Sequence, residues 1–206
     1  MSAELVPRRI ADDVLEYKVG SPRQAQSLAA QLRALDLAED VVAGLTTVSV
    51  RFDPHDVTTL KAALGTVRQI EAMPARTAEP IELAIRYGGE YGPDLAAICA
   101  SAGLSEPAFV EMHSGQIHTV EMIGFTPGFS YMSGLPDGLS VPRLSAPRPR
   151  VPAGSVGISS EYTGIYALSG PGGWPLIGQV REQLFDPEAE MPFRLLPQYR
   201  VRFRPV

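Results

Sequence analysis

Glycine and proline are concentrated in one quarter of this chain, and this restricts its fold more than any other feature. Residues 124–178 contain 11 glycines and 8 prolines, half of the 38 that the 206-residue chain carries. Helices do not run through such a density of helix breakers. Short strands joined by shaped loops do tolerate it, as in a small barrel or sandwich. With further strands expected at 117–125 and 199–203, the second half predicts a β domain.

A pair of short helices is predicted just before this β segment. Pro93 suits the first turn of a helix that Gly103 is placed to stop, and Ser105 can cap a second helix running to about His113. Two short helices with a tight turn are also typical of DNA-binding proteins. Residues 93–114 contain no lysine or arginine, so we do not interpret them as a DNA-reading helix-turn-helix.

The first 75 residues predict a small α/β unit with the order strand, helix, two strands, helix. The first strand is expected at residues 13–19, and Pro22 opens the first helix. Residues 40–52 suggest two strands joined by a turn near Gly44. A second helix follows Pro54, with Val57, Leu60, Leu64 and Val67 on its buried face. This order matches a ferredoxin-like split βαβ fold, which needs one more strand. Residues 81–87 alternate in polarity and either supply that strand or open the next domain.

The polar, proline-flanked residues 74–80 separate the two halves and are the boundary candidate. We therefore expect an α+β chain of two domains. Residues 1–79 would form the small ferredoxin-like α/β domain, and residues 80–206 the β domain.

Composition narrows the functional classes. The net charge of −5 disfavours nucleic acid as a partner, and the single cysteine, Cys99, fits a reducing compartment. No signal peptide and no membrane span is visible in the sequence, so the cytoplasm is the expected location. Three histidines and one cysteine do not predict a zinc site, and we expect no metal. Phosphate-loop, dinucleotide-binding and metalloprotease motifs are absent from the sequence.

Three arginines stand close together in this acidic chain: Arg143, Arg148 and Arg150. Arg148 and Arg150 alternate along a stiff, extended backbone around a proline, so both can point to one side. Two planar guanidinium forks suit a carboxylate or a phosphate. The alternative is a surface that forms ion pairs with Asp and Glu.

The only tryptophan, Trp174, follows Gly172 and Gly173. Backbone without side chains lets a ligand approach the main chain and stack on the indole. In the alternative interpretation, Trp174 fills the barrel core.

His113, Ser155 and Thr163 carry the remaining candidate polar groups. His113 ends the second short helix and is either a general base or a cap of the helix C-terminus. Ser155 and Thr163 lie in glycine-rich loops, where hydroxyls more often stabilise turns than attack substrates, and we retain them as candidate binding residues.

Residues 87–178 contain a series of distinctive blocks. They are YGGEYGPDL at 87–95, HS at 113–114, GFTPGFSY at 124–131, PR at 142–143 and 147–148, RVPAGSVGI at 150–158, TGIY at 163–166, PGGW at 171–174 and LIG at 176–178. In order and spacing these blocks resemble the KipI-like family, whose members are also labelled allophanate hydrolase subunit 1 or the B subunit of bacterial 5-oxoprolinase. The sequence departs from the family at Tyr162, where a glutamine is common, and at Gln198-Tyr199, where a Gly-Asp pair is common.

The resemblance implies a cyclophilin-like β-barrel for the second domain and a small-molecule substrate. It also implies a C-subunit-like companion (allophanate hydrolase subunit 2) and an A-subunit-like protein, which together with the B subunit open 5-oxoproline to glutamate with ATP. The ATP is expected at the level of the complex, with nothing bound covalently to this chain. Within the motif blocks, Tyr131 joins Arg148, Arg150, Ser155, Thr163, Gly172, Gly173 and Trp174 as candidate substrate-binding residues, and His113 is the catalytic candidate.

Two other roles follow from the same resemblance. One is inhibition of a sensor histidine kinase, and the other is partnership with a biotin-dependent, urea-carboxylase-type enzyme. Allophanate hydrolysis itself needs a Ser-Ser-Lys apparatus. The two lysines of this chain, Lys18 and Lys61, do not lie in a loop that could supply it.

Overall fold

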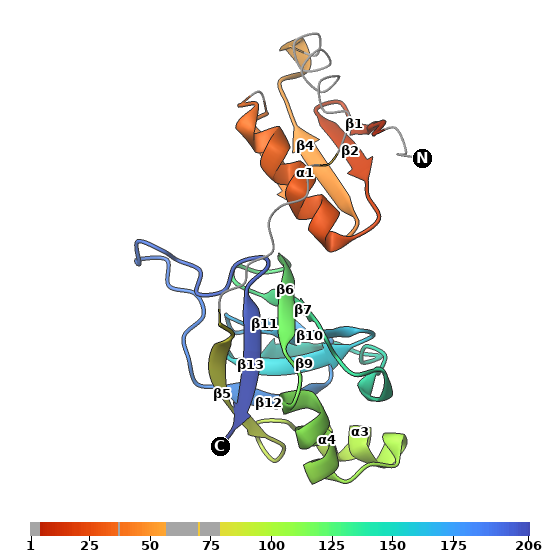
Figure 1. The fold of residues 1–206 in the computed structure, drawn as a ribbon, viewed down its shortest axis with the longest axis vertical. Coiled ribbons are helices and arrows are strands. Elements are labelled where there is room, and N and C mark those ends of the chain that lie inside the picture. The colour runs from red at the N-terminus through yellow and green to blue at the C-terminus, as the bar shows by residue number, and fades with distance from the viewer. Residues whose placement is uncertain (1–4, 37, 57–69, 71–78) are drawn as a thin grey trace. The chain divides into compact units, whose positions relative to one another are not determined.

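The chain forms two compact units, residues 1–75 and 76–206 (Figure 1). A computed structural model describes residues 5–36, 38–56, 70 and 79–206. Most of the predicted joint at 74–80 lies outside the described residues, as does the helix predicted after Pro54 beyond a short 3₁₀ turn at Pro54–Asp56. The proposed division into domains 1–79 and 80–206 therefore stays a prediction.

The N-terminal unit is a four-stranded antiparallel sheet with one described helix. Across the sheet the strands are β1 (Arg8–Ala11), β2 (Val14–Lys18), β4 (Thr47–Arg51) and β3 (Asp40–Ala43). The helix α1 (Pro22–Ala34) begins at Ser21, whose side-chain oxygen accepts a hydrogen bond from the Gln24 amide at 3.3 Å. Its buried face packs in one cluster with Val48 and Val50 of the sheet. Sequence and structure agree on α1 and on the strand pair around the turn at Gly44.

One edge of this sheet differs from the expectation. The short strand β1 pairs with β2, at the edge where a ferredoxin-like sheet would place its last strand. Residues 81–87, the other candidate for that position, belong to the second unit. The described residues therefore do not confirm a ferredoxin-like fold.

The second unit is built on a closed barrel of seven strands. In order around the barrel they are β10 (Tyr162–Ile165), β7 (Ser130–Ser133), β6 (His118–Ile123), β13 (Arg200–Pro205), β5 (Ile81–Tyr87), β12 (Leu176–Val180) and β9 (Ser155–Ser159). All pairs are antiparallel except β13 with β5. The expected β domain of short strands is confirmed, and the chain as a whole is α+β.

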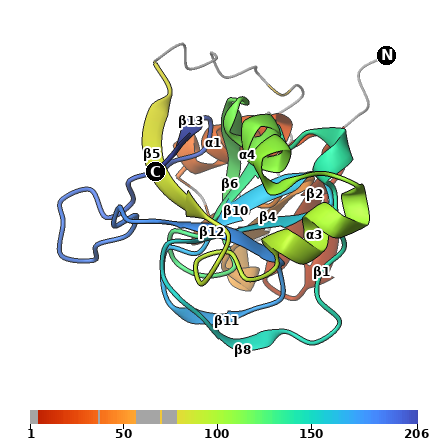
Figure 2. The ribbon, with the colours of Figure 1, turned by 90° about the horizontal axis from the view of Figure 1, so that it is seen from below.

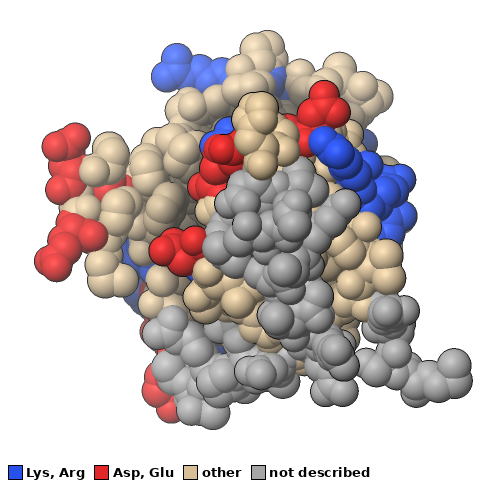
Figure 3. Space-filling model, turned by 90° about the horizontal axis from the view of Figure 1, so that it is seen from above, with Lys and Arg blue, Asp and Glu red and all other residues tan. Residues whose placement is uncertain are grey.

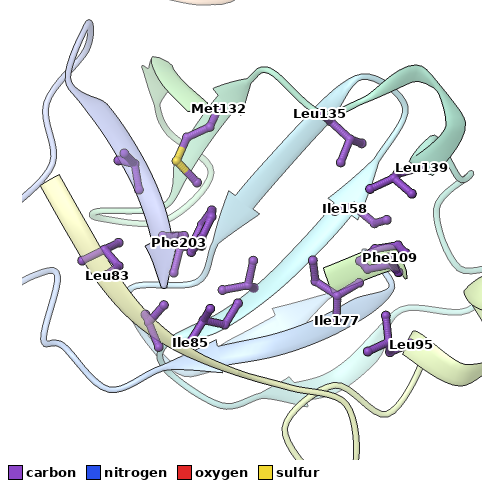
Figure 4. Packing of buried hydrophobic residues seen from close by; sticks show 14 of the residues in the cluster. Leu83, Ile85, Leu95, Phe109, Met132, Leu135, Leu139, Ile158, Ile177 and Phe203 are labelled. Atoms are coloured by element: carbon purple, nitrogen blue, oxygen red, sulfur yellow. The ribbon is translucent and has the colours of Figure 1, made fainter. Parts of the chain in front are cut away.

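The barrel interior is a packed core. Alternate residues of the strands point inward, including Leu83, Ile85, Met132, Ile158 and Phe203, each with at most 1% of its surface exposed (Figure 4). A core filled in this way has the close packing of other protein interiors.

Two helices, α3 (Leu95–Ala102) and α4 (Glu106–Ser114), lie at one end of the barrel (Figure 1). As expected, Gly103 ends α3 in the left-handed conformation with a φ of 66°. Ser105 caps α4 by accepting a hydrogen bond from the Ala108 amide at 3.3 Å. Leu95 of α3 and Phe109 of α4 are buried in the barrel core and hold the two helices against it.

Among the described residues, no single helix has the length and hydrophobicity needed to cross a membrane. Taken together, α3 and α4 have the length and composition that a membrane span needs, and the two helices are bent by 96° at the break between them.

A two-stranded ribbon lies outside the barrel. It consists of β8 (Arg148–Val151) and β11 (Gly170–Gly172), which run side by side in Figure 2. A second, smaller apolar cluster lies beside this ribbon and is called the outer, aromatic cluster below. Its buried residues are Phe129, Val151, Tyr166, Trp174 and Leu176. A further 3₁₀ turn, Asp137–Leu139, lies in the connection between β7 and β8.

The surface carries charges of both signs. Figure 3 shows side chains of both signs among uncharged ones on the coloured part of one face, in places next to one another. This mixed distribution agrees with the net charge of −5.

Candidate functional site

The outer apolar cluster is built on two glycines in the barrel wall. Gly164 of β10 and Gly157 of β9 alternate with residues that point into the barrel, so their own positions face outward. A Cβ atom at Gly164 would lie 2.7 Å from Phe129 Cζ and 2.8 Å from Trp174 Cζ3, closer than side chains approach one another. The glycines therefore let two large rings lie directly on the barrel wall.

Phe129 is the centre of this aromatic cluster. Its ring centroid lies 4.8 Å from those of Tyr131 and Tyr166 and 5.5 Å from that of Trp174, each in an edge-to-face arrangement. Only 7% of Trp174 is exposed. The indole thus fills the outer cluster rather than the barrel interior or an open pocket.

Gly172 serves close packing, and Gly173 contributes a backbone hydrogen bond. A Cβ atom at Gly172 would lie 2.5 Å from the Tyr166 hydroxyl oxygen, and the Trp174 amide donates to that oxygen at 3.4 Å. The carbonyl of Gly173 accepts a hydrogen bond from the Leu144 amide at 2.8 Å. This bond holds the loop that carries Arg143 against the aromatic cluster.

Arg148 is held by a carboxylate from far along the chain. Its Nη2 lies 2.7 Å from Asp94 Oδ1, while Asp94 Oδ2 accepts a hydrogen bond from the Leu176 amide at 2.6 Å. Arg148 Nη1 is buried without a hydrogen-bond partner among the described residues. Asp94 and Tyr166 were not among the sequence-predicted site residues, because only the fold brings them to Arg148 and Trp174.

Arg150 does not share this partner. Its Nε donates to Ser169 Oγ at 3.2 Å on the exposed side of the ribbon. The structure therefore gives Arg148 and Arg150 separate partners, and a joint grip on one anion stays a prediction.

Arg143 is the third arginine of the group and is exposed. Within the described part of the chain it forms no ion pair. Burial raises the pKa of Tyr131, and the charge of Arg143 opposes this rise. Burial likewise raises the pKa of Tyr166, opposed by its bond with the Trp174 amide and by the charges of Arg143 and Arg148. Both phenols are neutral near pH 7 and can donate hydrogen bonds.

His113 lies inside the barrel, apart from this face. Its exposed fraction is 0%, its Nδ1 lies 2.6 Å from the Tyr87 hydroxyl and its Nε2 lies 3.1 Å from Thr163 Oγ1. His118 Nε2 donates to the His113 carbonyl at 3.1 Å. Burial, and secondarily the charge of His118, hold the pKa of His113 well below its usual range, so the ring is neutral.

The position of His113 bears on its predicted role. Both ring nitrogens are used in joining α4 to β5 and β10, so the alternative that it caps the helix C-terminus is wrong. A ligand on the outer face would not reach the imidazole without opening the barrel. Thr163 and Ser155 are also buried, at 0% and 2% exposure, and they are not among the residues at the aromatic cluster.

A pocket of about 300 Å³ lies beside the loop that precedes Arg143. It is lined by Leu135, Pro136, Asp137, Ser140, Val141, Pro142, Ser160 and Glu161. This volume suits a small molecule. The two carboxylates in the lining disfavour an anion there, so we place the candidate anion site at the arginines instead.

The chain is similar in sequence to several known proteins. The family described as carboxyltransferase domain, subdomain C and D, matches residues 10–195. The 5-oxoprolinase B subunit of Escherichia coli O157:H7 is 50% identical over 125 residues, which are 61% of this chain and 57% of that protein. The corresponding protein of Bacillus subtilis is 42% identical over 123 residues, 60% of this chain and 51% of its own length. Each match thus spans little more than half of the relative.

Solved structures share the fold. TTHA0988 has a TM-score of 0.80 and 32% identity, with 98% of this chain matching 41% of that one. PH0987 of Pyrococcus horikoshii has a TM-score of 0.61 and 29% identity over 98% of this chain and 97% of its own. The urea amidolyase of Kluyveromyces lactis, with a TM-score of 0.74 and 17% identity over 98% of this chain and 15% of its own, agrees in fold alone.

Proposed function

This chain belongs to the family of carboxyltransferase domains, subdomains C and D, and on that basis we propose that it is one component of a heteromeric, ATP-dependent amide hydrolase of the 5-oxoprolinase type. Its three curated relatives, at 42–50% identity, are each a 5-oxoprolinase B subunit. In the proposed reaction, water adds across the lactam C–N bond of 5-oxoproline. The carbonyl carbon becomes the side-chain carboxylate of glutamate, and the nitrogen becomes its amino group.

One observation carries the assignment of a substrate site to this chain: Arg143 and Arg148 both lie beside the aromatic cluster. The Leu144 amide donates to the Gly173 carbonyl next to Trp174, and Arg148 pairs with Gly172 in the ribbon. The charges of both arginines oppose the rise in the pKa of Tyr166, and the charge of Arg143 opposes the rise in the pKa of Tyr131. 5-Oxoproline carries a carboxylate on a small flat ring. Guanidinium groups bind carboxylates through paired, charge-assisted hydrogen bonds, and aromatic edges accommodate the ring.

In this proposal the chain binds and orients the substrate rather than breaking the bond. Arg143, which forms no ion pair in the described part of the chain, would contact the carboxylate, and the hydroxyl of the partly buried Tyr131 would donate to it. Arg148, already paired with Asp94, would add positive charge beside them. His113 would act as an orienting residue that fixes Tyr87 and Thr163 inside the barrel.

The remaining chemistry is assigned to companions. No complete catalytic set of nucleophile, base and oxyanion donors is visible among the described residues. We therefore propose that ATP is used by the complex that this chain forms with a C-subunit-like and an A-subunit-like protein. The proposed location of this complex is the cytoplasm. For this chain we keep a cyclophilin-like barrel at 80–206 and a ferredoxin-like domain at 1–79 as the proposed finer folds.

Purification of the tagged chain from its native host tests the proposal. The expected companion, identified by mass, is a C-subunit-like protein in a fixed ratio to this chain. Recovery of a histidine kinase, or of this chain alone under conditions that preserve other complexes, would contradict the heteromer.

A further inference from the structure

Phe125 occupies an unusual backbone conformation in the loop between β6 and β7. Its φ is 68°, and the Thr126 amide donates to the Gly124 carbonyl at 2.8 Å across it. This hydrogen bond from residue i+2 to residue i, with positive φ at the central residue, defines a rare and strained γ-turn. Positive φ is especially unfavourable for a bulky side chain.

The surrounding structure imposes this turn. The Gly124 amide donates to the Phe129 carbonyl at 3.1 Å, and the Phe129 amide donates to the Thr126 carbonyl at 3.0 Å. Gly128, with a φ of 77°, packs so closely that a Cβ atom there would lie 2.7 Å from Ala167 Cβ and 3.0 Å from Phe185 Cβ. The loop is therefore locked in place, and Phe125 is held in a conformation that asparagine or glycine would adopt more readily.

The strain is not offset by burial of the ring. Phe125 is 57% exposed, although Phe129 beside it is 1% exposed. The two rings meet edge to face with centroids 5.6 Å apart, and Phe129 also contacts Tyr131 and Trp174. The exposed ring thus stands at the border of the candidate substrate site. Strained backbone positions cluster at functional sites such as active sites and ligand clamps.

We propose that Phe125 is the apolar anchor through which the companion protein docks on this barrel, at the border of the substrate site. Its ring would enter an apolar socket on the companion, while Arg143 stays free for the substrate carboxylate. The inference rests on the proposed function, which supplies the companion.

Two observations favour a protein as the occupant. Aromatic residues, phenylalanine included, are enriched in the cores of protein interfaces. In addition, 98% of this chain matches only 41% of TTHA0988. In that relative, the remainder, more than half of the chain, is additional protein joined to this fold. A second domain or protein beside this fold is therefore an arrangement that a relative already has.

The test compares binding of the C-subunit-like protein from the same host to the full chain and to two variants by calorimetry. Phe125→Asn keeps the turn, because asparagine tolerates positive φ. We expect it to raise the Kd at least tenfold, about 1.4 kcal/mol, without lowering the melting temperature by more than a few degrees. Met191→Asn is the matched control, since Met191 is also large, apolar and exposed, at 68%. Its Kd should change less than twofold.

The outcomes separate the two claims. If the unaltered chain does not bind the companion, the proposed function fails and the inference fails with it. If the companion binds Phe125→Asn as tightly as the unaltered chain, only the inference is overturned. Loss of 5-oxoproline binding with an unchanged Kd for the companion would also overturn it, because Phe125 would then serve the small ligand. If Phe125→Asn does not fold, Phe125→Gly replaces it, and failure of both to fold would assign the ring a structural role instead.

Discussion

Asp94 and Arg148 join two segments that are 54 residues apart in the chain. Asp94 is the N-cap residue of α3, yet its carboxylate caps no helix amide and instead accepts from Arg148 Nη2 at 2.7 Å and from the Leu176 amide at 2.6 Å. One side chain thus links α3, β8 and β12. The ribbon that covers the aromatic cluster depends on this link for its position.

Asp94→Ala should destabilise the second unit. The substitution leaves a mostly buried guanidinium and a backbone amide without their acceptor, which costs about 1–3 kcal/mol. Glu39→Ala removes the carboxylate of an ion pair with Arg51 whose two side chains are each 54% exposed, and it should change stability by less than about 1 kcal/mol. Denaturant unfolding of both variants gives the comparison, and equal effects would show that the Asp94 link is no more than a surface ion pair.

Arginine-to-lysine variants should separate ligand binding from folding. Arg143→Lys keeps the charge but loses the paired N–H donors of the guanidinium group. 5-Oxoproline should therefore bind roughly 5- to 150-fold more weakly to the assembled complex, and the melting temperature should not change. Arg148→Lys should lower both affinity and melting temperature, because Arg148 is also paired with Asp94. Arg150→Lys tests the joint clamp predicted from the sequence. Calorimetry with parallel thermal melts measures all three, and unchanged affinity in all of them would remove the anion site from this face.

Gly164→Ala should disrupt the outer cluster. The added methyl group would meet Phe129 and Trp174 at 2.7 and 2.8 Å, an overpacking that costs about 1–3 kcal/mol. Gly170→Ala is its control, because nothing lies within 4 Å of a Cβ there and its φ is not positive. Thermal melts should place Gly170→Ala near the unaltered chain and Gly164→Ala well below it. The reverse order would mean that the cluster can shift away from the barrel wall.

Two buried histidines should make the barrel sensitive to acid. Burial lowers the pKa of His113 and of His118 below the usual 6.5, with the backbone bonds of His118 opposing part of its shift. The unfolded chain therefore binds more protons than the folded chain below about pH 6.5. Stability should fall as the pH decreases from there toward the folded-state values, by up to about 1.4 kcal/mol per pH unit for each histidine.

Denaturant unfolding between about pH 8 and pH 5.5 measures this dependence. His118→Gln removes one of the two titrating rings and should reduce the slope. A free energy of unfolding that stays constant over this range in the unaltered chain would contradict the account of neutral, buried histidines.

Local signals in the sequence predicted many elements of the fold. Pro22 with its apolar stripe, Gly103 and Ser105 act on their own neighbours, and the structure has α1, α3 and α4 where these residues indicate. The strand β1 was missed because all four of its residues are exposed, so it shows no alternation of burial. The parallel pairing of β5 with β13 joins residues more than a hundred positions apart, which no local pattern specifies.

The site was harder to predict than the fold. Arg148 and Trp174 were recognisable because their neighbours are glycine and proline, but their partners Asp94 and Tyr166 come from other segments. His113 looked available at a helix end. Its ring is covered by Phe109 of the same helix and by Phe203, 90 residues later in the chain, so its burial depends on the barrel closing.

Reconstitution of the reaction tests the central claim most directly. This chain is mixed with the A-subunit-like and C-subunit-like proteins of its host, and glutamate formed from 5-oxoproline is measured with and without ATP. The account predicts negligible glutamate from this chain alone or from its two companions alone, and ATP-dependent glutamate formation when all three are present. Glutamate formation by this chain alone, or at the same rate by the companions without it, would contradict the assignment of this chain as a required component of the enzyme.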